Sequence, residues 1–402
     1  MAGDNEEFRL VYRLAAQADE QLRVRRLMLS LFPDDREAST EVRIGFRSGL
    51  GFGEVARVLR DFPESGLAPR DAWITSWTSH ARQLELLAGQ DEAAGYRGSA
   101  GERLLRASVA WFLVRSLDPE GEGRLASLEE HWRTFADGAR LAEPAYEAMT
   151  LSDPAGELHG WWLPAGPGPA PALVFYAGTG LDKEMVALYL RDRLARRGVG
   201  LLVIDGPGVG EALWRDAIAS RPDYETVTAS AVAWLRDRPE VGDRPVGVGG
   251  LSLGGLYALR SAARDPGVAC AVCWGGILDF PRLVRTRWAN RTRESEPLVA
   301  AQLAALVGAA DIDGALARSR EWRVDALLPA LTQPTLMLYG EADRQTSAED
   351  ATEAFKAVGA VDKTLRLFTA EEGGAAHCQS DDPFAARELM ADWVASRLGA
   401  RA

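Results

Sequence analysis

Hydrophobic and polar positions follow two different periods along the chain, and the change falls near residue 146. Before this point, apolar residues recur every three or four positions, which is the spacing of an amphipathic helix. The pattern predicts helices within residues 6–32, 53–62, 81–90, 101–117 and 127–142. We therefore expect a helical domain over residues 1–145. Its aromatic residues at helical spacing are predicted to lie in the core: Trp73, Trp77, Trp111, Phe112 and Trp132.

After residue 146, short apolar runs alternate with amphipathic stretches of helical length. A turn at Asp153-Pro-Ala-Gly156 predicts an antiparallel pair of strands, and the next buried strand ends at Ala177. Further strands are predicted within residues 200–205, 245–251, 268–276, 334–340 and 364–370, and helices within 183–198, 223–238, 254–265 and 386–398. Strands that alternate with helices form a mostly parallel sheet with helices on both faces, so we expect an α/β domain over residues 146–402.

Residues 280–330 interrupt this alternation with helical sequence that is rich in arginine. An insertion at the carboxyl edge of a parallel sheet overhangs the place where ligands bind, so we expect a helical lid. The arginine-rich stretch 283–293 has two interpretations. We prefer a solvated helix face with ion-pair partners; the other is a surface that attracts an anionic substrate.

Composition narrows the classes of partner. The net charge of −12 argues against a nucleic-acid surface, which needs clustered lysine and arginine. No segment reaches the run of about 18 apolar residues that a membrane span requires. The acidic start MAGDNEEFRL is unlike a signal peptide. We therefore expect a cytoplasmic protein that acts on a small molecule, without a nucleic-acid or membrane partner.

The sequence offers no metal or cofactor motif. Cys270 and Cys273 lie in the apolar run VACAVCW, so we interpret them as buried thiols rather than metal ligands. The loop Asp205-Gly-Pro-Gly-Val-Gly-Glu211 lacks the G-x-G-x-x-G spacing of a dinucleotide site. We expect it to close the floor of the active site, and we expect no metal and no cofactor.

One serine among four glycines carries the main chemical signal. Gly250-Leu-Ser-Leu-Gly254 fits the G-x-S-x-G pattern, with a predicted strand before it and a predicted helix after it. In that context the turn exposes the serine hydroxyl, and the next backbone N–H faces the oxyanion that forms during acyl transfer. We therefore predict Ser252 as a nucleophile and the Leu253 amide as an oxyanion donor.

A serine nucleophile needs a histidine base and a carboxylate that orients the base. His377 is the only histidine after Ser252, in a loop that follows the last predicted strand. Asp343 follows the strand that ends at residue 340 and is the predicted carboxylate, with Glu341 as the alternative.

Two further loops are candidates for the site. The loop after the first long buried strand is the expected source of a second oxyanion donor, either Thr179 or Gly180. Asp279 follows the segment CWGGIL and has two interpretations of equal weight. It is the N-cap of a helix, or it is an acid that orients the histidine or contacts substrate.

Together, the serine turn, the order Ser–Asp–His and the segments GTGLDKE, DGPGVGE and CWGGILDF resemble α/β-hydrolases of the FrsA-like group. In particular they resemble the bacterial 2,6-dihydroxypseudooxynicotine hydrolase and the fungal pigment polyketide-shortening hydrolase. The resemblance covers most of residues 146–402 and extends more loosely over the helical part. It implies the α/β-hydrolase fold, an N-terminal helical cap that helps form the substrate cavity, and a homodimer. Carried over by position, it assigns the nucleophile to Ser252, the acid to Asp343 and the base to His377.

The resemblance also implies hydrolysis of a carbon–carbon bond next to a carbonyl, in a 1,3-dicarbonyl or aryl ketone of aromatic or polyketide-like type. Such a reaction releases a carbanion that must be held as an enol and protonated. His377 is the expected proton donor, and Asp279, Lys183 or a lid arginine are the candidates to assist it. Two alternatives stay open: a carboxylesterase, thioesterase or acyl-transferring cyclase on the same fold, or a protein that binds without turnover.

Overall fold

The computed structural model describes residue 45 and residues 48–59, 69–115, 121–143, 145–289 and 296–400. The helix predicted within residues 6–32 lies outside these ranges. The chain divides into two compact units, residues 1–143 and 144–402. Among the described residues, no single helix combines the length and apolar composition needed to cross a membrane. One pair of helices reaches that length together, but it is bent by 42° at the break between them.

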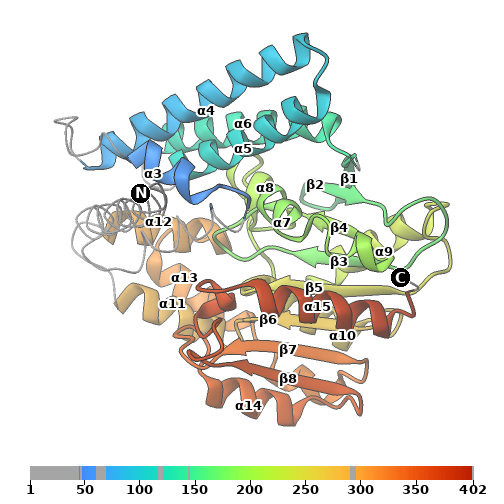
Figure 1. The fold of residues 1–402 in the computed structure, drawn as a ribbon. Coiled ribbons are helices and arrows are strands. Elements are labelled where there is room, and N and C mark those ends of the chain that lie inside the picture. Colours follow the sequence, from blue (N-terminus) through green and yellow to red (C-terminus); the bar gives the residue numbers. More distant parts are fainter. Residues whose placement is uncertain are drawn as a thin grey trace, which may run out of the picture. The chain divides into compact units, whose positions relative to one another are not determined.

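Helices pack side by side in the N-terminal unit (Figure 1): α3 (Phe52–Leu59), α4 (Pro69–Ala93), α5 (Arg97–Arg115) and α6 (Gly121–Leu141). α5 and α6 approach so closely that a Cβ on Gly138 would lie 2.9 Å from the amide nitrogen of Leu105. α4 extends beyond the predicted segment 81–90 in both directions. The predicted aromatic core is confirmed, because all five residues are buried: Trp73, Trp77, Trp111, Phe112 and Trp132.

One sheet organises residues 144–402. Its strands are β1 (Glu147–Asp153), β2 (Gly156–Leu163), β3 (Ala172–Tyr176), β4 (Gly200–Ile204), β5 (Val246–Leu251), β6 (Ala271–Trp274), β7 (Thr335–Gly340) and β8 (Lys363–Phe368). Their order is β1-β2-β4-β3-β5-β6-β7-β8. β2 pairs antiparallel with β1 and β4, and the other pairs are parallel. The predicted mostly parallel sheet, with its antiparallel entry turning at residues 153–156, is confirmed.

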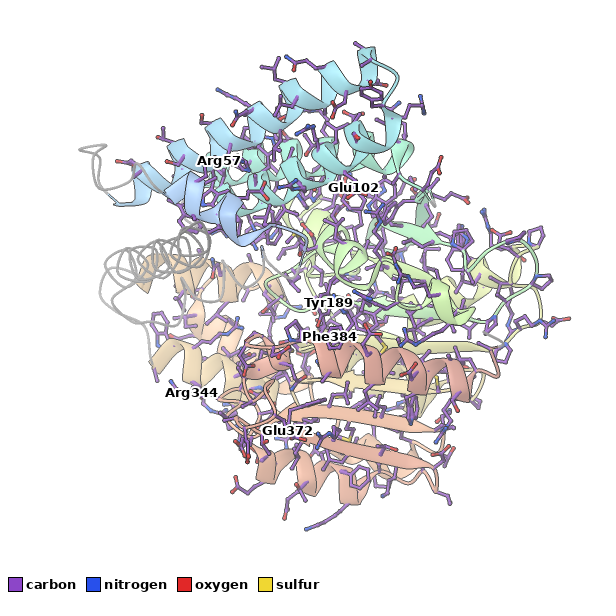
Figure 2. All side chains as sticks on the ribbon, viewed as in Figure 1. Arg57, Glu102, Tyr189, Arg344, Glu372 and Phe384 are labelled. Carbon is purple, nitrogen blue, oxygen red and sulfur yellow. The ribbon has the colours of Figure 1, made fainter. Side chains whose placement is uncertain are left out.

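Helices cover both faces of this sheet. Alternate residues of a strand point to opposite faces, and Val174 and Tyr176 of β3 belong to one buried cluster with α9 (Glu225–Arg236) and α10 (Leu253–Arg264). α7 (Lys183–Leu190) and α15 (Phe384–Arg397) lie on the other face, where Arg387 donates a hydrogen bond of 3.3 Å to the carbonyl of Tyr189. Figure 1 shows α15 lying across the sheet, and Figure 2 labels Tyr189 and also Phe384 at the start of α15.

The helical insertion between β6 and β7 is confirmed. It contains α11 (Phe280–Ala289), α12 (Glu296–Val307) and α13 (Ile312–Arg318), followed by two 3-10 turns. Three details differ from the sequence prediction. α7 ends at Leu190, and residues up to Arg197 continue as tighter turns, because Arg193 and Arg197 bond the carbonyls three positions before them.

The other two differences are additional helices. α8 (Gly210–Trp214) begins inside the glycine-rich loop that follows β4, and α14 (Ala348–Ala357) follows β7. α14 starts at an N-cap, Ser347, whose side chain accepts a hydrogen bond of 3.1 Å from the amide of Asp350.

Candidate active site

Ser252 lies in the tight turn between β5 and α10. Its φ of 55° and ψ of −118° place it in a region that residues other than glycine rarely adopt. Its amide donates to the carbonyl of Trp274 at 2.9 Å, and its own carbonyl accepts from Gly255 and Ile277. The surrounding hydrogen bonds therefore hold a strained backbone in place at Ser252.

The glycines around Ser252 are required by close packing of the backbone. A Cβ on Gly250 would lie 2.2 Å from the carbonyl carbon of Gly254, and one on Gly254 would lie 2.4 Å from the carbonyl oxygen of Tyr176. The loop after β3 also touches the turn, because a Cβ on Gly178 would lie 2.8 Å from the Cβ of Ser252. Side chains at these positions would separate α10 and the 178–180 loop from the nucleophile position.

The structure brings Ser252, His377 and Asp343 together. His377 Nε2 lies 3.0 Å from Ser252 Oγ, and His377 Nδ1 lies 2.8 Å from Asp343 Oδ2. Asp343 is buried, and its other oxygen accepts hydrogen bonds from the amides of Gln345 at 2.8 Å and Thr346 at 3.2 Å. Arg344, the next residue, is exposed and is labelled in Figure 2. A neutral imidazole that donates from Nδ1 to the carboxylate presents Nε2 as an acceptor toward the serine hydroxyl.

Burial of the His377 ring disfavours the imidazolium, but the Cys378 sulfur and the Asp343 carboxylate outweigh burial and raise the pKa of His377. Cys378 Sγ lies 3.5 Å from His377 Nε2, and the residue adopts a positive φ of 50°. The loop before His377 is held by Asp381, whose carboxylate accepts hydrogen bonds from three consecutive amides at 3.0–3.1 Å, those of residues 374–376. This acid was not found from the sequence, because it acts only through backbone contacts.

The predicted oxyanion donors lie on the two loops beside Ser252. Leu253 begins α10, directly after the nucleophile position. Thr179 is half-buried and Gly180 exposed in the loop after β3. The geometry does not separate these two amides as the second donor, so both remain proposals.

Asp279 and Glu341 have other contacts. One oxygen of Asp279 accepts a hydrogen bond of 2.8 Å from the amide of Arg282, which is the N-cap arrangement for α11. Glu341 is exposed and accepts from the amide of Ala370 at 2.7 Å. The carboxylate that contacts His377 is thus Asp343, and we assign Asp279 to capping and propose no substrate contact for it.

Lys183 is buried in a cluster of carboxylates. Its Nζ lies 2.7 Å from Glu211, 2.9 Å from Glu184 and 3.1 Å from Asp205. Burial lowers the pKa of Lys183, but these carboxylates outweigh it and raise the pKa well above its ordinary value. Burial is also the main reason that the pKa of Asp205 is raised, with Lys183 opposing it. Because the Lys183 ammonium already forms ion pairs with three carboxylates, we propose no substrate contact for it.

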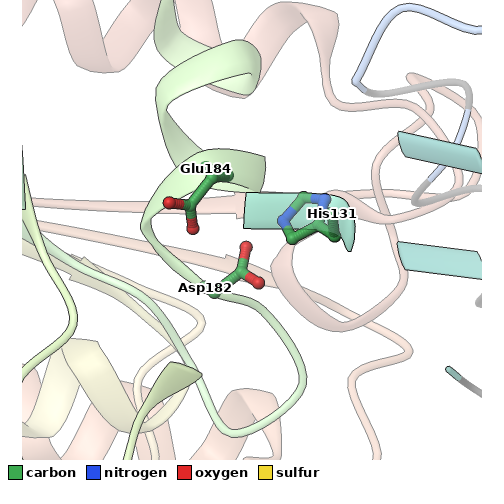
Figure 3. Close-up of side chains that lie close together, drawn as sticks. All are labelled: His131, Asp182 and Glu184. Carbon is green, nitrogen blue, oxygen red and sulfur yellow. The ribbon is translucent and has the colours of Figure 1, made fainter. Parts of the chain in front are cut away.

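This cluster joins the two glycine-rich loops. Asp205 follows β4, and its carboxylate also accepts from the amides of Lys183 at 2.7 Å and Glu211 at 2.9 Å. Asp182 caps α7 by accepting from the amide of Met185 at 3.1 Å, and Figure 3 shows it with Glu184 at the start of this helix. Figure 3 also draws His131, a residue of the N-terminal unit. The cluster therefore anchors the C-terminal end of the loop that carries Thr179 and Gly180.

Cys270 and Cys273 are buried thiols, as predicted. Burial raises the pKa of each to about 12, so both stay protonated near neutral pH. Within residues 145–289 and 296–400, no group of three His, Cys, Asp or Glu side chains has the spacing of a metal site.

Comparison with known proteins identifies the fold. No protein-family model matches the chain. The solved structure of "2,6-dihydroxy-pseudo-oxynicotine Hydrolase" is similar with a TM-score of 0.77 and 26% identity, over 90% of this chain and 97% of that one. A curated relative from an Acremonium species, "Alpha/beta hydrolase pydG", is 27% identical over 258 residues, or 60% of this chain. This chain has the α/β-hydrolase fold.

A second curated relative with this resemblance is "2,6-dihydropseudooxynicotine hydrolase" of Paenarthrobacter nicotinovorans, which is 32% identical over 216 residues, or 52% of this chain. The chain spans only 56% of the length of that relative and 59% of the Acremonium one. The α/β-hydrolase fold and the resemblance to this bacterial enzyme and to fungal hydrolases, both predicted from the sequence, are confirmed.

Proposed function

We propose that this protein is a serine-nucleophile hydrolase in which Ser252 attacks, His377 transfers protons and Asp343 orients His377. The observation that carries the proposal is the single imidazole that contacts the serine hydroxyl at 3.0 Å and a buried carboxylate at 2.8 Å. Its substrate is a 1,3-dicarbonyl or aryl ketone in an aromatic or polyketide-like small molecule. The bond that breaks is a carbon–carbon bond next to the carbonyl.

The first half of the reaction forms an acyl-enzyme. Ser252 Oγ bonds to the carbonyl carbon while its proton passes to His377 Nε2. The oxyanion accepts hydrogen bonds from the Leu253 amide and from Thr179 or Gly180. The carbon–carbon bond then breaks, the electron pair leaves with the departing carbon as an enolate, and this enolate takes the proton from His377.

The second half uses water. His377, neutral again, takes a proton from a water molecule that attacks the acyl-enzyme. Collapse of the second tetrahedral intermediate releases the acid and returns a proton to Ser252. Asp343 keeps Nδ1 protonated throughout, because its buried carboxylate accepts a hydrogen bond from Nδ1–H and favours the imidazolium that forms twice per cycle.

An ester, thioester or acyl-transfer substrate is the second candidate, since the same three side chains carry those reactions with a different leaving group or acceptor. The carbon–carbon reading rests on the sequence resemblance, and the curated relative named for a pseudooxynicotine substrate supports it. A binding protein without turnover is the third candidate. The assembled contacts among Ser252, His377 and Asp343 argue against it.

Product analysis tests the proposal. The purified protein and its Ser252→Ala variant are incubated with matched 1,3-diketones, esters and thioesters, and products are identified by mass spectrometry. We expect the diketone to yield one acid and one ketone, with loss of turnover by about 10⁶-fold in the variant. Cleavage of the ester alone would support the second candidate, and equal turnover by the variant would contradict a serine nucleophile.

The homodimer is also a proposal, and analytical ultracentrifugation tests it. We expect twice the monomer mass of 43.5 kDa. A cytoplasmic location is likewise a proposal and is tested by fractionation of the source cells.

A further inference from the structure

One arginine of helix α11 lies on the buried side of that helix. Phe280, Leu283 and Val284 are buried and share one face of α11. Arg287 follows Leu283 by four positions and Val284 by three, so it extends the same face. It is half-buried, whereas Arg285 is exposed. Arg285 and Arg287 therefore lie in two different environments on α11.

Arg287 lacks an acidic partner within the described part of the chain. Arg282, on the same helix, forms an ion pair with Asp350 of α14. Arg287 instead donates one hydrogen bond, from Nη2 to Thr179 Oγ1 at 3.2 Å. A guanidinium has five N–H donors, and its remaining donors have no protein acceptor among residues 145–289 and 296–400. Burial lowers the pKa of Arg287, with no carboxylate opposing the shift.

The contact with Thr179 places this cation beside the reaction centre. Gly178, the residue before Thr179, is packed against Ser252, with 2.8 Å between its hypothetical Cβ and the serine Cβ. Arg287 therefore bonds the loop that borders the nucleophile and contains the candidate oxyanion donors. A half-buried cation that has no carboxylate partner among the described residues has lost part of its hydration, and a bound anion would offset that cost through charge-assisted hydrogen bonds.

We propose that Arg287 binds an anionic oxygen of the substrate, beside the carbonyl that Ser252 attacks. This inference rests on the proposed hydrolase function and narrows its substrate class to acidic molecules. The anionic oxygen belongs to a carboxylate or to an ionised enol, since both present a partly delocalised negative oxygen that a guanidinium binds. A 1,3-dicarbonyl compound supplies the second kind when its enol ionises.

The test compares ligands that differ in charge. A neutral fluorophosphonate labels the protein, and the labelling rate is measured from intact mass. The competitors are benzoylacetate, its methyl ester, and benzoylacetone at pH values below and above the ionisation of its enol. The variants are Arg287→Gln, Arg287→Lys and Arg285→Gln, the last being the matched control on the exposed side of α11. Calorimetric titration of the same compounds measures the charge preference independently of serine reactivity.

In the parent and in Arg285→Gln, we expect an anionic compound to slow labelling at a concentration about 10-fold or more lower than the methyl ester requires. A hydrogen bond to a charged group is worth about 1.5–3 kcal/mol, which corresponds to such a factor. Arg287→Gln should lose this preference, taken as the ratio of the two protecting concentrations within that variant, and Arg287→Lys should retain part of it. Preference for benzoylacetate assigns a carboxylate, and preference for benzoylacetone only above its ionisation assigns an enolate.

Two results would overturn the inference. They are no charge preference in the parent, or an unchanged charge preference in Arg287→Gln, whether the preference is measured by protection or by calorimetric titration. Failure of the hydrolase proposal itself is distinguishable, because the parent would then not be labelled while the titration would still report the charge preference.

Discussion

A single methyl group added to the loop beside Ser252 tests how closely this loop packs against the nucleophile. It should change both the labelling rate of the active site and the stability of the protein. In Gly178→Ala, the new Cβ would lie 2.8 Å from Ser252 Cβ and 3.1 Å from the carbonyl oxygen of Leu251. An ordinary contact begins at 3.4 Å, so the loop and the serine must move apart by 0.6 Å. Both neighbours belong to the tight turn after β5, which leaves the loop as the part that moves most.

Two magnitudes follow from this displacement. Overpacking of this kind costs about 1–3 kcal/mol of stability, and each kcal/mol lowers Tm by about 2–4 °C in a domain of this size. A misplacement of about 1 Å at a reaction centre costs on the order of 100-fold in rate. We therefore expect fluorophosphonate labelling of Gly178→Ala to slow by about 10-fold or more, with a fall in Tm of several degrees.

Gly180→Ala is the control in the same loop. A Cβ on Gly180 would meet nothing within 4 Å, and the backbone amide is retained. Its stability should change by no more than about 0.5 kcal/mol, and its labelling rate should stay close to that of the parent. Labelling rates and thermal unfolding of both variants decide the matter. Parental labelling by Gly178→Ala would refute the close approach of this loop to Ser252.

Three other substitutions test separate parts of the site. Lys183→Met leaves three buried carboxylates without their cation and should cost about 3–5 kcal/mol in chemical denaturation. The control Arg196→Met breaks an exposed ion pair with Asp192 and should cost at most about 1 kcal/mol; equal losses would contradict a buried cluster. Asp343→Asn removes a group that raises the pKa of His377. Labelling needs the neutral imidazole, so in this variant the labelling rate should rise at lower pH than in the parent, while the maximal rate falls by about 10⁴-fold. A labelling rate that rises at the same pH as in the parent would exclude an effect of Asp343 on the pKa of His377. Asp279→Ala should cost about 1 kcal/mol as a lost N-cap with labelling retained, whereas loss of labelling would restore its role as an orienting acid.

The fold could be predicted where the local signal was strong. Buried strands such as residues 200–204 form continuous apolar runs, and the glycines around Ser252 mark a turn too tight for side chains. The unpredicted α14 also had a local signal, because Ser347 is followed three residues later by Asp350, a typical N-cap pattern. The sequence therefore contained enough local information to predict the start of this helix.

Other parts of the site depend on contacts between distant segments. Lys183 and Asp205 are 22 residues apart in sequence, and only the parallel pairing of β3 and β4 brings their loops together. The environment of Arg287 could not be predicted, because the sequence does not show which face of α11 is buried. Only the spacing of Arg287 from Leu283 and Val284 was visible in the sequence. Sequence spacing showed which residues could react, and the folded chain showed which charges are already paired.

The proposed reaction depends on Ser252 being an activated nucleophile. The most direct measurement is the intact mass of the parent protein and of Ser252→Ala after incubation with a fluorophosphonate. We expect one adduct on the parent and none on the variant. An adduct on both proteins, or on neither, would contradict the claim that Ser252, His377 and Asp343 act together.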